Sequence, residues 1–100
     1  MNYPKVSIII VNYNQAKITI DCLKSLSSIS YPRFEIIVVD NNSQDGSVNT
    51  IRKKYPVVKL VESKENLGYA GGNNLGLKYC DAEYILILNN DTKVEKNFLE

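Results

Sequence analysis

Residues 84–92 read YILILNNDT, and this stretch decides how the rest of the chain is interpreted. Five large apolar residues, 84–88, end abruptly in two amides, a carboxylate and a hydroxyl. An apolar run of this length is typical of a buried strand in a parallel sheet. Open α/β sheets bind their ligands outside the carboxyl ends of the strands. Asp91, just past the end of this run, is therefore the first candidate for a functional residue.

Three more apolar runs of strand length precede it, at residues 6–11, 34–39 and 57–61. We expect each to form a strand, because each is short, rich in branched side chains and bounded by polar residues or proline. The four runs recur at intervals close to the roughly 30 residues of a βαβ unit. This spacing indicates that the strands belong to one sheet.

A helical pattern fills the first gap between these strands. Ile18, Cys22 and Leu26 recur every four residues within residues 15–28, which predicts an amphipathic helix with one apolar stripe. Asn14 precedes this segment and belongs to a residue type that caps helix N-termini. We therefore expect a helix over residues 15–28 that is capped by Asn14.

The other two gaps also favour helices. A second helix is expected to have Ser47 as its cap and to end at Pro56. Residues 67–74, LGYAGGNN, are expected to form a glycine-rich loop that runs into a third helix carrying Leu77 and Tyr79. Strands that alternate with helices predict an α/β fold, with a mostly parallel sheet of about four strands flanked by helices.

The composition excludes several classes of function. The chain has 100 residues and a net charge of +1, so it is one small domain or part of one, and nothing favours nucleic acid as a partner. Its apolar runs are far shorter than the roughly 20 residues that span a bilayer, so no transmembrane segment is expected. The start of the chain lacks a signal-peptide cleavage site. With no CxxC motif, Cys22 and Cys80 are expected to be reduced core residues of a cytoplasmic protein.

Several known site chemistries are also excluded. No glycine is followed by Lys-Ser or Lys-Thr, as a P-loop requires, and residues 12–14 lack the glycines of a dinucleotide site. The absence of histidine excludes Ser-His nucleophilic catalysis. What remains is oxygen chemistry. Asp91 could hold a hard divalent ion, Asp40 could accept hydrogen bonds from a base or ribose, and Tyr13 could stack on a nucleobase.

The polar segments after the strands should meet, because the carboxyl ends of parallel strands lie along one edge of a sheet. These segments are residues 12–14, 40–43, 62–74 and 89–92. Taken singly, their amides and carboxylates are explained as local caps. Taken together they favour a ligand site. We expect Tyr13, Asp40 and Asp91 to face one cleft.

Four motifs resemble those of a known family. Residues 4–14 read PKVSIIIVNYN, residues 38–47 VVDNNSQDGS, residues 66–74 NLGYAGGNN and residues 88–91 LNND. In this order and at these spacings they resemble family 2 glycosyltransferases of the GT-A fold, and they are most similar to the rhamnosyltransferase-like branch. The resemblance covers essentially the whole chain.

The resemblance implies an inverting transfer of a sugar from a nucleoside diphosphate to an acceptor hydroxyl in cell-surface polysaccharide synthesis. Tyr13 would pack on the base, Asp40 would hydrogen-bond the base edge, and the backbone of Val11 and Asn12 would border the nucleoside. The expected donor is dTDP-rhamnose or a UDP-sugar, and the expected acceptor is a saccharide or a lipid-linked molecule. Among the other tyrosines, Tyr69 alone stays a candidate for contact with the sugar.

The resemblance also assigns the diphosphate and the cation. The ribose and diphosphate would lie against Gly68, Gly71 and Asn74. Asn89, Asn90 and Asp91 occupy the family's Asp-x-Asp position, in which the last acid coordinates Mg²⁺ or Mn²⁺. Because the amide of Asn89 keeps hydrogen bonding but has no charge, the cation would depend on Asp91 alone.

The resemblance further implies what these residues do not supply. The family's general base is an acidic residue in the second half of the domain, beyond residue 100 in this numbering. Residues 1–100 are therefore expected to be a partial GT-A domain, the nucleotide-sugar-binding half without the acceptor half, and to be inactive alone. We expect the parent protein to be cytoplasmic or peripheral at the inner membrane face. The uncovered sheet edge predicts a homodimer.

Three alternatives stay open. The main one is a non-catalytic nucleotide-binding or assembly module of the same fold. A nucleotidyltransferase would carry a glycine-rich, basic loop after the first strand, which residues 12–15 do not supply. A receiver-like domain would carry acids at that place, where this chain has Asn12.

Overall fold

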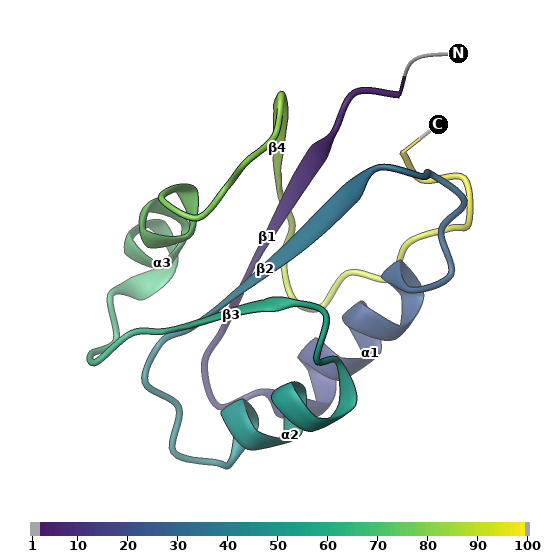
Figure 1. Ribbon diagram of the computed structural model, residues 1–100. Coiled ribbons are helices and arrows are strands. Elements are labelled where there is room, and N and C mark those ends of the chain that lie inside the picture. Colours follow the sequence, from purple (N-terminus) through teal and green to yellow (C-terminus); the bar gives the residue numbers. More distant parts are fainter. Residues whose placement is uncertain (1–2, 100) are drawn as a thin grey trace.

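The computed structural model describes residues 3–99, and this part of the chain forms four strands and three helices. They follow one another as β1 (Val6–Asn12), α1 (Ala16–Leu26), β2 (Phe34–Asp40), α2 (Ser47–Lys54), β3 (Lys59–Glu62), α3 (Gly68–Leu77) and β4 (Tyr84–Ile87). All strand pairs are parallel, in the order β3-β2-β1-β4 (Figure 1). The predicted α/β fold is confirmed, with β1 and β2 at the centre of the sheet.

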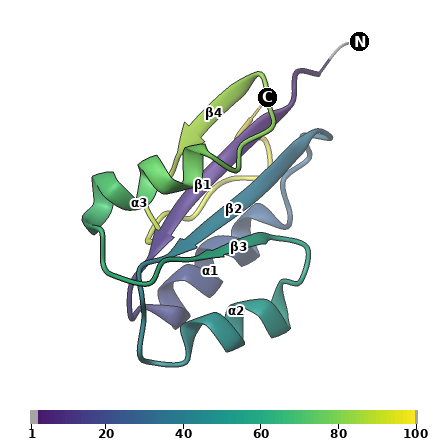
Figure 2. The ribbon, with the colours of Figure 1, turned by 60° about the vertical axis from the view of Figure 1, so that its left-hand side comes forward.

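The helices cover both faces of the sheet. Helices α1 and α2 lie on one face and α3 lies on the other (Figures 1 and 2). Side chains alternate along a strand, so Ile8 and Ile10 pack in the core on the α1 and α2 side, whereas Ile9 packs in the core beneath α3. All three are fully buried. Burial on both faces explains why the central strands are continuous apolar runs.

The glycine-rich segment is a helix and not a loop. Helix α3 begins at Gly68, so the loop predicted over residues 67–74 forms its first turns, and Tyr79 lies beyond its end. A Cβ atom added to Gly76 would come within 2.8 Å of Cγ2 of Ile9. Close packing of this helix on the sheet therefore explains the glycine, and this packing overrides its low helix propensity.

The strand boundaries and the burial of β4 differ from the prediction. Strands β1 and β2 each run one residue further than expected, and β3 begins at Lys59 because Val57 is 91% exposed. Strand β4 is at the edge of the sheet, and its side chains are largely exposed, with Tyr84 at 60% and Ile85 at 47%. The prediction of a buried strand is wrong here, because within residues 3–99 only β1 pairs with β4.

Two predicted helix caps are also wrong. Asn14 has a positive φ of 51°, and its Oδ1 accepts a hydrogen bond from the backbone N–H of Gln44 at 2.7 Å instead of capping α1. Ser47 is the first residue of α2, and its backbone N–H donates to Oδ1 of Asp45 at 2.9 Å. The polar side chains of these loops bond to other loop backbone and do not follow the simple capping pattern.

After β4 the chain runs alongside α1. The backbone N–H of Val94 donates to Oγ of Ser25 at 3.1 Å, and that of Ser30 donates to the carbonyl of Lys96 at 2.8 Å. Within residues 3–99 no helix is long and apolar enough to cross a membrane. The prediction about a signal peptide concerns the start of the chain, where residues 1–2 lie outside the described residues.

Candidate functional site

The four polar segments meet along one edge of the sheet, which we call the carboxyl rim (residues 12–15, 40–46, 62–69 and 89–92). Asn12 ends β1 and pairs in register with Asp40, which ends β2, and Asp40 pairs in turn with Glu62 of β3. Past the strands, the backbone N–H of Asn41 donates to the carbonyl of Asn12 at 2.9 Å. On the other side, the N–H of Leu88 donates to the backbone of β1 at 3.0 Å. The rim is thus continuous across all four strands.

Asp40 lies beneath this rim and is 2% exposed. Its Oδ1 accepts hydrogen bonds from Nδ2 of Asn12 at 2.9 Å and from Oγ of Ser43 at 2.7 Å. Its Oδ2 accepts a hydrogen bond from the backbone N–H of Ser43 at 2.9 Å. Both carboxylate oxygens are therefore engaged within the protein, and they tie the end of β1 to the loop after β2.

Thr19 extends this network to the segment after β4. Its Oγ1 donates to Oδ1 of the buried Asn12 at 2.5 Å and accepts a hydrogen bond from Nδ2 of Asn90 at 3.1 Å. The same Nδ2 donates to Oε1 of Gln15 at 2.9 Å. Hydrogen bonds therefore connect Asp40, through Asn12 and Thr19, to the amide of Asn90.

A cleft of about 270 Å³ opens above these buried groups. Its walls include Val11, Tyr13, Asn41, Gly68, Tyr69 and Asn90. Tyr13 and Tyr69 are 44% and 52% exposed, so both residues are accessible to a ligand from solvent. The Asn41 amide links the rim to α3, since its Nδ2 donates to the carbonyl of Gly68 at 2.9 Å. Exposed rings beside fixed amides suit a flat, polar ligand such as a nucleobase.

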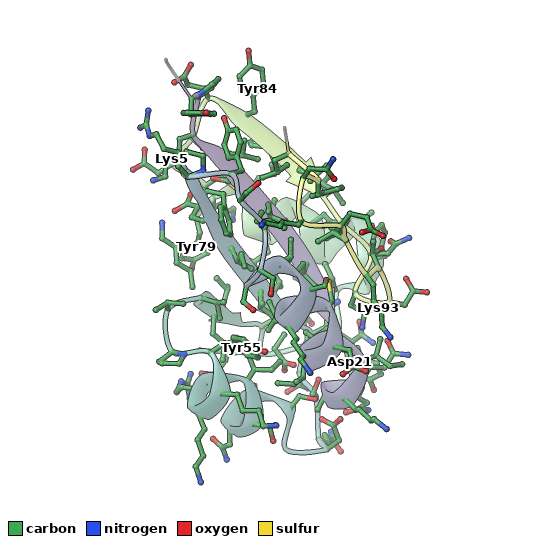
Figure 3. The ribbon with its side chains drawn as sticks, turned by 90° about the vertical axis from the view of Figure 1, so that its right-hand side faces the viewer. Lys5, Asp21, Tyr55, Tyr79, Tyr84 and Lys93 are labelled. Atoms are coloured by element: carbon green, nitrogen blue, oxygen red, sulfur yellow. The ribbon has the colours of Figure 1, made fainter. Side chains whose placement is uncertain are left out.

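Asp91 lies in a neighbouring cavity of about 200 Å³, on the α1 side of the sheet. This cavity is also lined by Asp21, Cys22, Thr92 and Lys93, and Figure 3 shows Asp21 and Lys93 near each other beside the middle of α1. Burial, with a contribution from the negative charge of Asp91, raises the pKa of the Cys22 thiol to about 11. The thiol is therefore protonated and unreactive at neutral pH.

The structure brings together only some of the predicted site residues. Val11, Tyr13, Gly68 and Asn90 share the cleft. The expectation that Tyr13, Asp40 and Asp91 face one cleft is wrong, because Asp40 is buried and Asp91 opens into the adjacent cavity. The side chain of Asn12 is also buried. Within the described residues, three further predicted positions are not part of the cleft walls: Gly71, Asn74 and Asn89.

Sequence reasoning missed Asn41, Gln15 and Thr19. The signal for Asn41 lies in the alternation of β2: Asp40 continues the buried side of Val38, so the next side chain is turned toward α3 and the cleft. Thr19 and Gln15 leave no comparable signal in the sequence. Their role depends on which strand lies beside β1 in the sheet: this is β4, and Asn90, which follows it, is 71 residues away from Thr19.

The residues near Asp91 fit a hard divalent cation only in part, because Lys93 and Ile18 line the same cavity as the oxygen groups. The carboxylates of Asp91 and Asp21 and the hydroxyl of Thr92 line one cavity, and oxygen ligands of this kind suit Mg²⁺ and Mn²⁺. Over residues 3–99, no three His, Cys, Asp or Glu side chains lie close enough to hold a metal by themselves. A cation at Asp91 would therefore need further oxygens from a ligand, as Mg²⁺ sites with phosphates commonly do.

Two curated relatives are similar over most of the chain. Poly-beta-1,6-N-acetyl-D-glucosamine synthase of Staphylococcus epidermidis is 33% identical over 92 residues, which is 90% of this chain and 22% of that protein. Poly(ribitol-phosphate) beta-glucosyltransferase of Bacillus spizizenii is 38% identical over 93 residues, 87% of this chain and 15% of that protein. The chain thus spans less than a quarter of the length of either relative.

Two solved structures are similar to this chain in fold and in sequence. The chain resembles S. aureus TarS 1-349 in complex with UDP, with a TM-score of 0.86 and 30% identity over 95% of this chain and 30% of that one. It also resembles the mannosyltransferase PcManGT from Pyrobaculum calidifontis in complex with GDP-Man and Mn²⁺, with a TM-score of 0.84 and 30% identity over 93% of this chain and 29% of that one.

The profile of one family covers nearly all of the chain. It is the profile described as Glycosyl transferase family 2, and it matches residues 7–100. The match takes in all four strands, the cleft and the Asp91 cavity. The chain therefore belongs to glycosyl transferase family 2.

Proposed function

We propose that this chain binds the nucleoside diphosphate of a sugar donor across the carboxyl rim, as the donor-binding part of a glycosyltransferase. The observation that carries the proposal is the cleft that is lined by Tyr13 and Tyr69 together with Asn41 and Asn90. An exposed tyrosine ring offers a stacking surface for a base, and the amides offer donors and acceptors for its edge or for the ribose.

A uridine nucleotide is the first candidate for the ligand. The similar TarS structure carries UDP, and another TarS structure carries UDP-GlcNAc. The rhamnosyltransferase-like branch and dTDP-rhamnose stay predictions.

In this proposal the base edge does not meet the carboxylate of Asp40, because both of its oxygens are engaged within the protein. Asn41 is equally buried at 2% exposed, but it lines the cleft. One Nδ2 proton of Asn41 remains after its bonds to the carbonyl of Gly68 and the backbone N–H of Leu67, and this proton is the candidate for contact with the base edge. Asp40 would then have an indirect role: its hydrogen bonds to Ser43 hold the loop that carries Asn41.

Asp91 would hold Mg²⁺ or Mn²⁺ against the diphosphate, with Asp21 and Thr92 as neighbouring oxygen groups. When bound, such a cation neutralises charge that builds on the departing diphosphate. The mannosyltransferase structure that carries Mn²⁺ supports a divalent ion in a protein of this fold. Asn90 lines the cleft while Asp91 lines the adjacent cavity, so these consecutive residues would join the nucleoside to the cation.

Transfer itself needs groups beyond those identified here. We propose that the general base and the acceptor site come from outside residues 1–100 of this numbering, and that the parent carries out an inverting transfer to a saccharide or lipid-linked acceptor in polysaccharide synthesis. The chain alone would bind the donor without transferring sugar. The open edge of β4, where Ile85 and Ile87 are each 47% exposed, supports the proposal of a homodimer.

The test is calorimetric titration of the chain with UDP, in Mn²⁺ and in a chelator. We expect binding that Mn²⁺ tightens by about tenfold or more, equivalent to about 1.4 kcal/mol. Asp91→Asn should remove the effect of Mn²⁺ while keeping the metal-independent part. Asp81→Asn is the matched control, because Asp81 is exposed at the opposite end of the sheet.

Two results would count against this function. Absence of UDP and dTDP binding in both conditions would contradict the donor-binding proposal. Binding that is unaffected by Mn²⁺ or by Asp91→Asn would favour the alternative, a non-catalytic nucleotide-binding module.

A further inference from the structure

We infer that Thr19, fully buried in the second turn of α1, is a positioning residue for the donor: it fixes the amide of Asn90 in the cleft and thereby the adjacent Asp91. The inference rests on the proposed function. It assigns a role in ligand binding to α1, a helix whose other buried residues are apolar core residues, Cys22, Leu23 and Leu26.

The geometry around the hydroxyl of Thr19 is specific. Its Oγ1 gives its only proton to Oδ1 of Asn12 at 2.5 Å, so the hydrogen bond from Nδ2 of Asn90 at 3.1 Å must use a lone pair of Oγ1. A hydroxyl is one of the few side-chain groups that can donate and accept at once. The methyl group of a valine would fit the same space but could do neither.

The amide of Asn90 is held twice by α1. Its Nδ2 donates to Oγ1 of Thr19 and to Oε1 of Gln15 at 2.9 Å. Gln15 is an exposed residue, whereas Thr19 is fully buried, so water competes more strongly for the bond to Gln15 than for the part-buried bond to Thr19. The bond to Thr19 is therefore the better shielded of the two bonds that orient the Asn90 amide.

Thr19 also connects the two halves of the proposed site. Through Asn12 it reaches Asp40, which holds the loop carrying Asn41, and through Asn90 it reaches the segment that carries Asp91. A shift of this segment would change the distance between the base cleft and the cation cavity. A donor that spans both requires this distance to be fixed before binding.

The test compares Thr19→Val with Thr19→Ser in UDP titrations with Mn²⁺, at a temperature where both variants are folded. Thr19→Val should weaken UDP binding by about three- to tenfold, the effect of one net hydrogen bond. Thr19→Ser keeps the hydroxyl and should stay within about twofold of the wild type. In an Asn90→Ala background, Thr19→Val should have a clearly smaller effect on UDP binding than in the wild type, because only its hydrogen bond to Asn12 is then left to lose.

The matched control is Ser7→Ala. Ser7 is also fully buried and also donates through its hydroxyl, to Oε2 of Glu35 at 2.5 Å, but it lies at the other end of β1. It should lower stability without changing UDP affinity. A general effect of lost stability would weaken UDP binding in both variants.

The outcomes separate this inference from the function on which it rests. Thr19→Val that binds UDP as tightly as the wild type would overturn the inference and leave the function intact. The same holds if Thr19→Val and Asn90→Ala weaken binding independently of each other. A wild-type chain that binds no UDP would contradict the proposed function itself.

Discussion

The two ends of the sheet are built from different chemistry. At the amino end, the carboxylate of Glu35 is bound by Nζ of Lys59 at 2.9 Å and by Oγ of Ser7 at 2.5 Å, with Nζ of Lys5 at 3.6 Å. At the carboxyl end, Asp40 is bound by neutral amide, hydroxyl and backbone groups. In Figure 3, Lys5 marks the amino end, away from Asp21 and Lys93 at the other.

This difference indicates which role each end of the sheet has. Glu35 joins three strands and the segment before β4, since the backbone N–H of Asp81 also donates to it, at 2.9 Å. Its charge is thus neutralised within the protein. At the carboxyl end Glu62 is paired with Arg52 at 2.9 Å and Asp40 is buried and hydrogen-bonded, whereas Asp91 forms no ion pair within residues 3–99, so its charge stays available to a cation. We interpret the amino end as serving the fold alone and the carboxyl end as serving both the fold and binding.

The largest expected effect is a loss of stability when the buried carboxylate at the carboxyl end is changed. Asp40→Asn would place amide protons against the donors of Ser43 or Asn12, because an amide has only one acceptor oxygen. We expect the free energy of unfolding to fall by about 2–3 kcal/mol in urea denaturation. The exposed Asp81→Asn should change it by less than about 0.5 kcal/mol. An Asp40→Asn variant as stable as the wild type would show that the buried network does not hold this end together.

The next effect distinguishes the middle of the sheet from its carboxyl end. Gly76→Ala should cost about 1–3 kcal/mol by overpacking, because the new Cβ would lie 2.8 Å from Ile9. Gly72→Ala would instead press on Nδ2 of Asn41 at 3.1 Å, at the edge of the cleft. Denaturation and UDP titration of both variants should show that only Gly72→Ala lowers affinity beyond its effect on stability. Equal affinities in the two variants would argue against Asn41 as a contact.

A smaller effect concerns binding alone. Tyr13→Ala should weaken UDP binding by about tenfold, since stacking of a base on an aromatic ring contributes about 1–3 kcal/mol. Tyr13→Phe should bind like the wild type, because the ring is kept. Tyr84→Ala is the control, an exposed tyrosine at the start of β4. Equal UDP affinity in Tyr13→Ala and the wild type would remove Tyr13 from the cleft's function.

The smallest effect is expected at the amino end and depends on pH. Burial disfavours the charge of Glu35, but the hydrogen bonds from Ser7 and Lys59 outweigh it and lower its pKa from 4.5 to about 2. A lowered pKa stabilises the fold above the unfolded value, so this contribution should disappear as the pH falls from about 4.5 to about 2. Glu35→Gln should lose about 1 kcal/mol at neutral pH and lack this step in acid denaturation. The UDP affinity of Glu35→Gln should not change. A loss of affinity would contradict the claim that the amino end takes no part in binding.

The sequence predicts the fold well because the signal is local. Apolar runs at the centre of a parallel sheet, such as Ile8 to Ile10, are continuous and cannot be confused with loops. It predicts the wrong environment for β4, because burial there depends on a neighbouring strand and not on the run itself. The sequence also does not predict that residues 68–77 are helical, because their glycines suggest a loop. Gly76 and Gly72 are instead explained by their close contact with Ile9 and Val11.

The site is predicted only in part for a similar reason. The segments that meet at the carboxyl rim follow from topology, so Tyr13 and Asn90 are placed correctly in one cleft. Which of two consecutive side chains lines the cleft depends on the alternation of side chains at the last residue of β2, and here it is Asn41 and not Asp40. The role of Thr19 cannot be predicted from the sequence pattern, because a buried threonine in an amphipathic helix does not differ in position from the apolar core residues beside it.

The most direct measurement of the central claim is the change in backbone amide resonances when UDP and Mg²⁺ are added to the chain. The account predicts shifts at the carboxyl rim, at Tyr13, Asn41, Gly68 and Asn90, and none at Lys5, Glu35 and Asp81. Shifts centred on the amino end, or spread evenly over both ends, would contradict it.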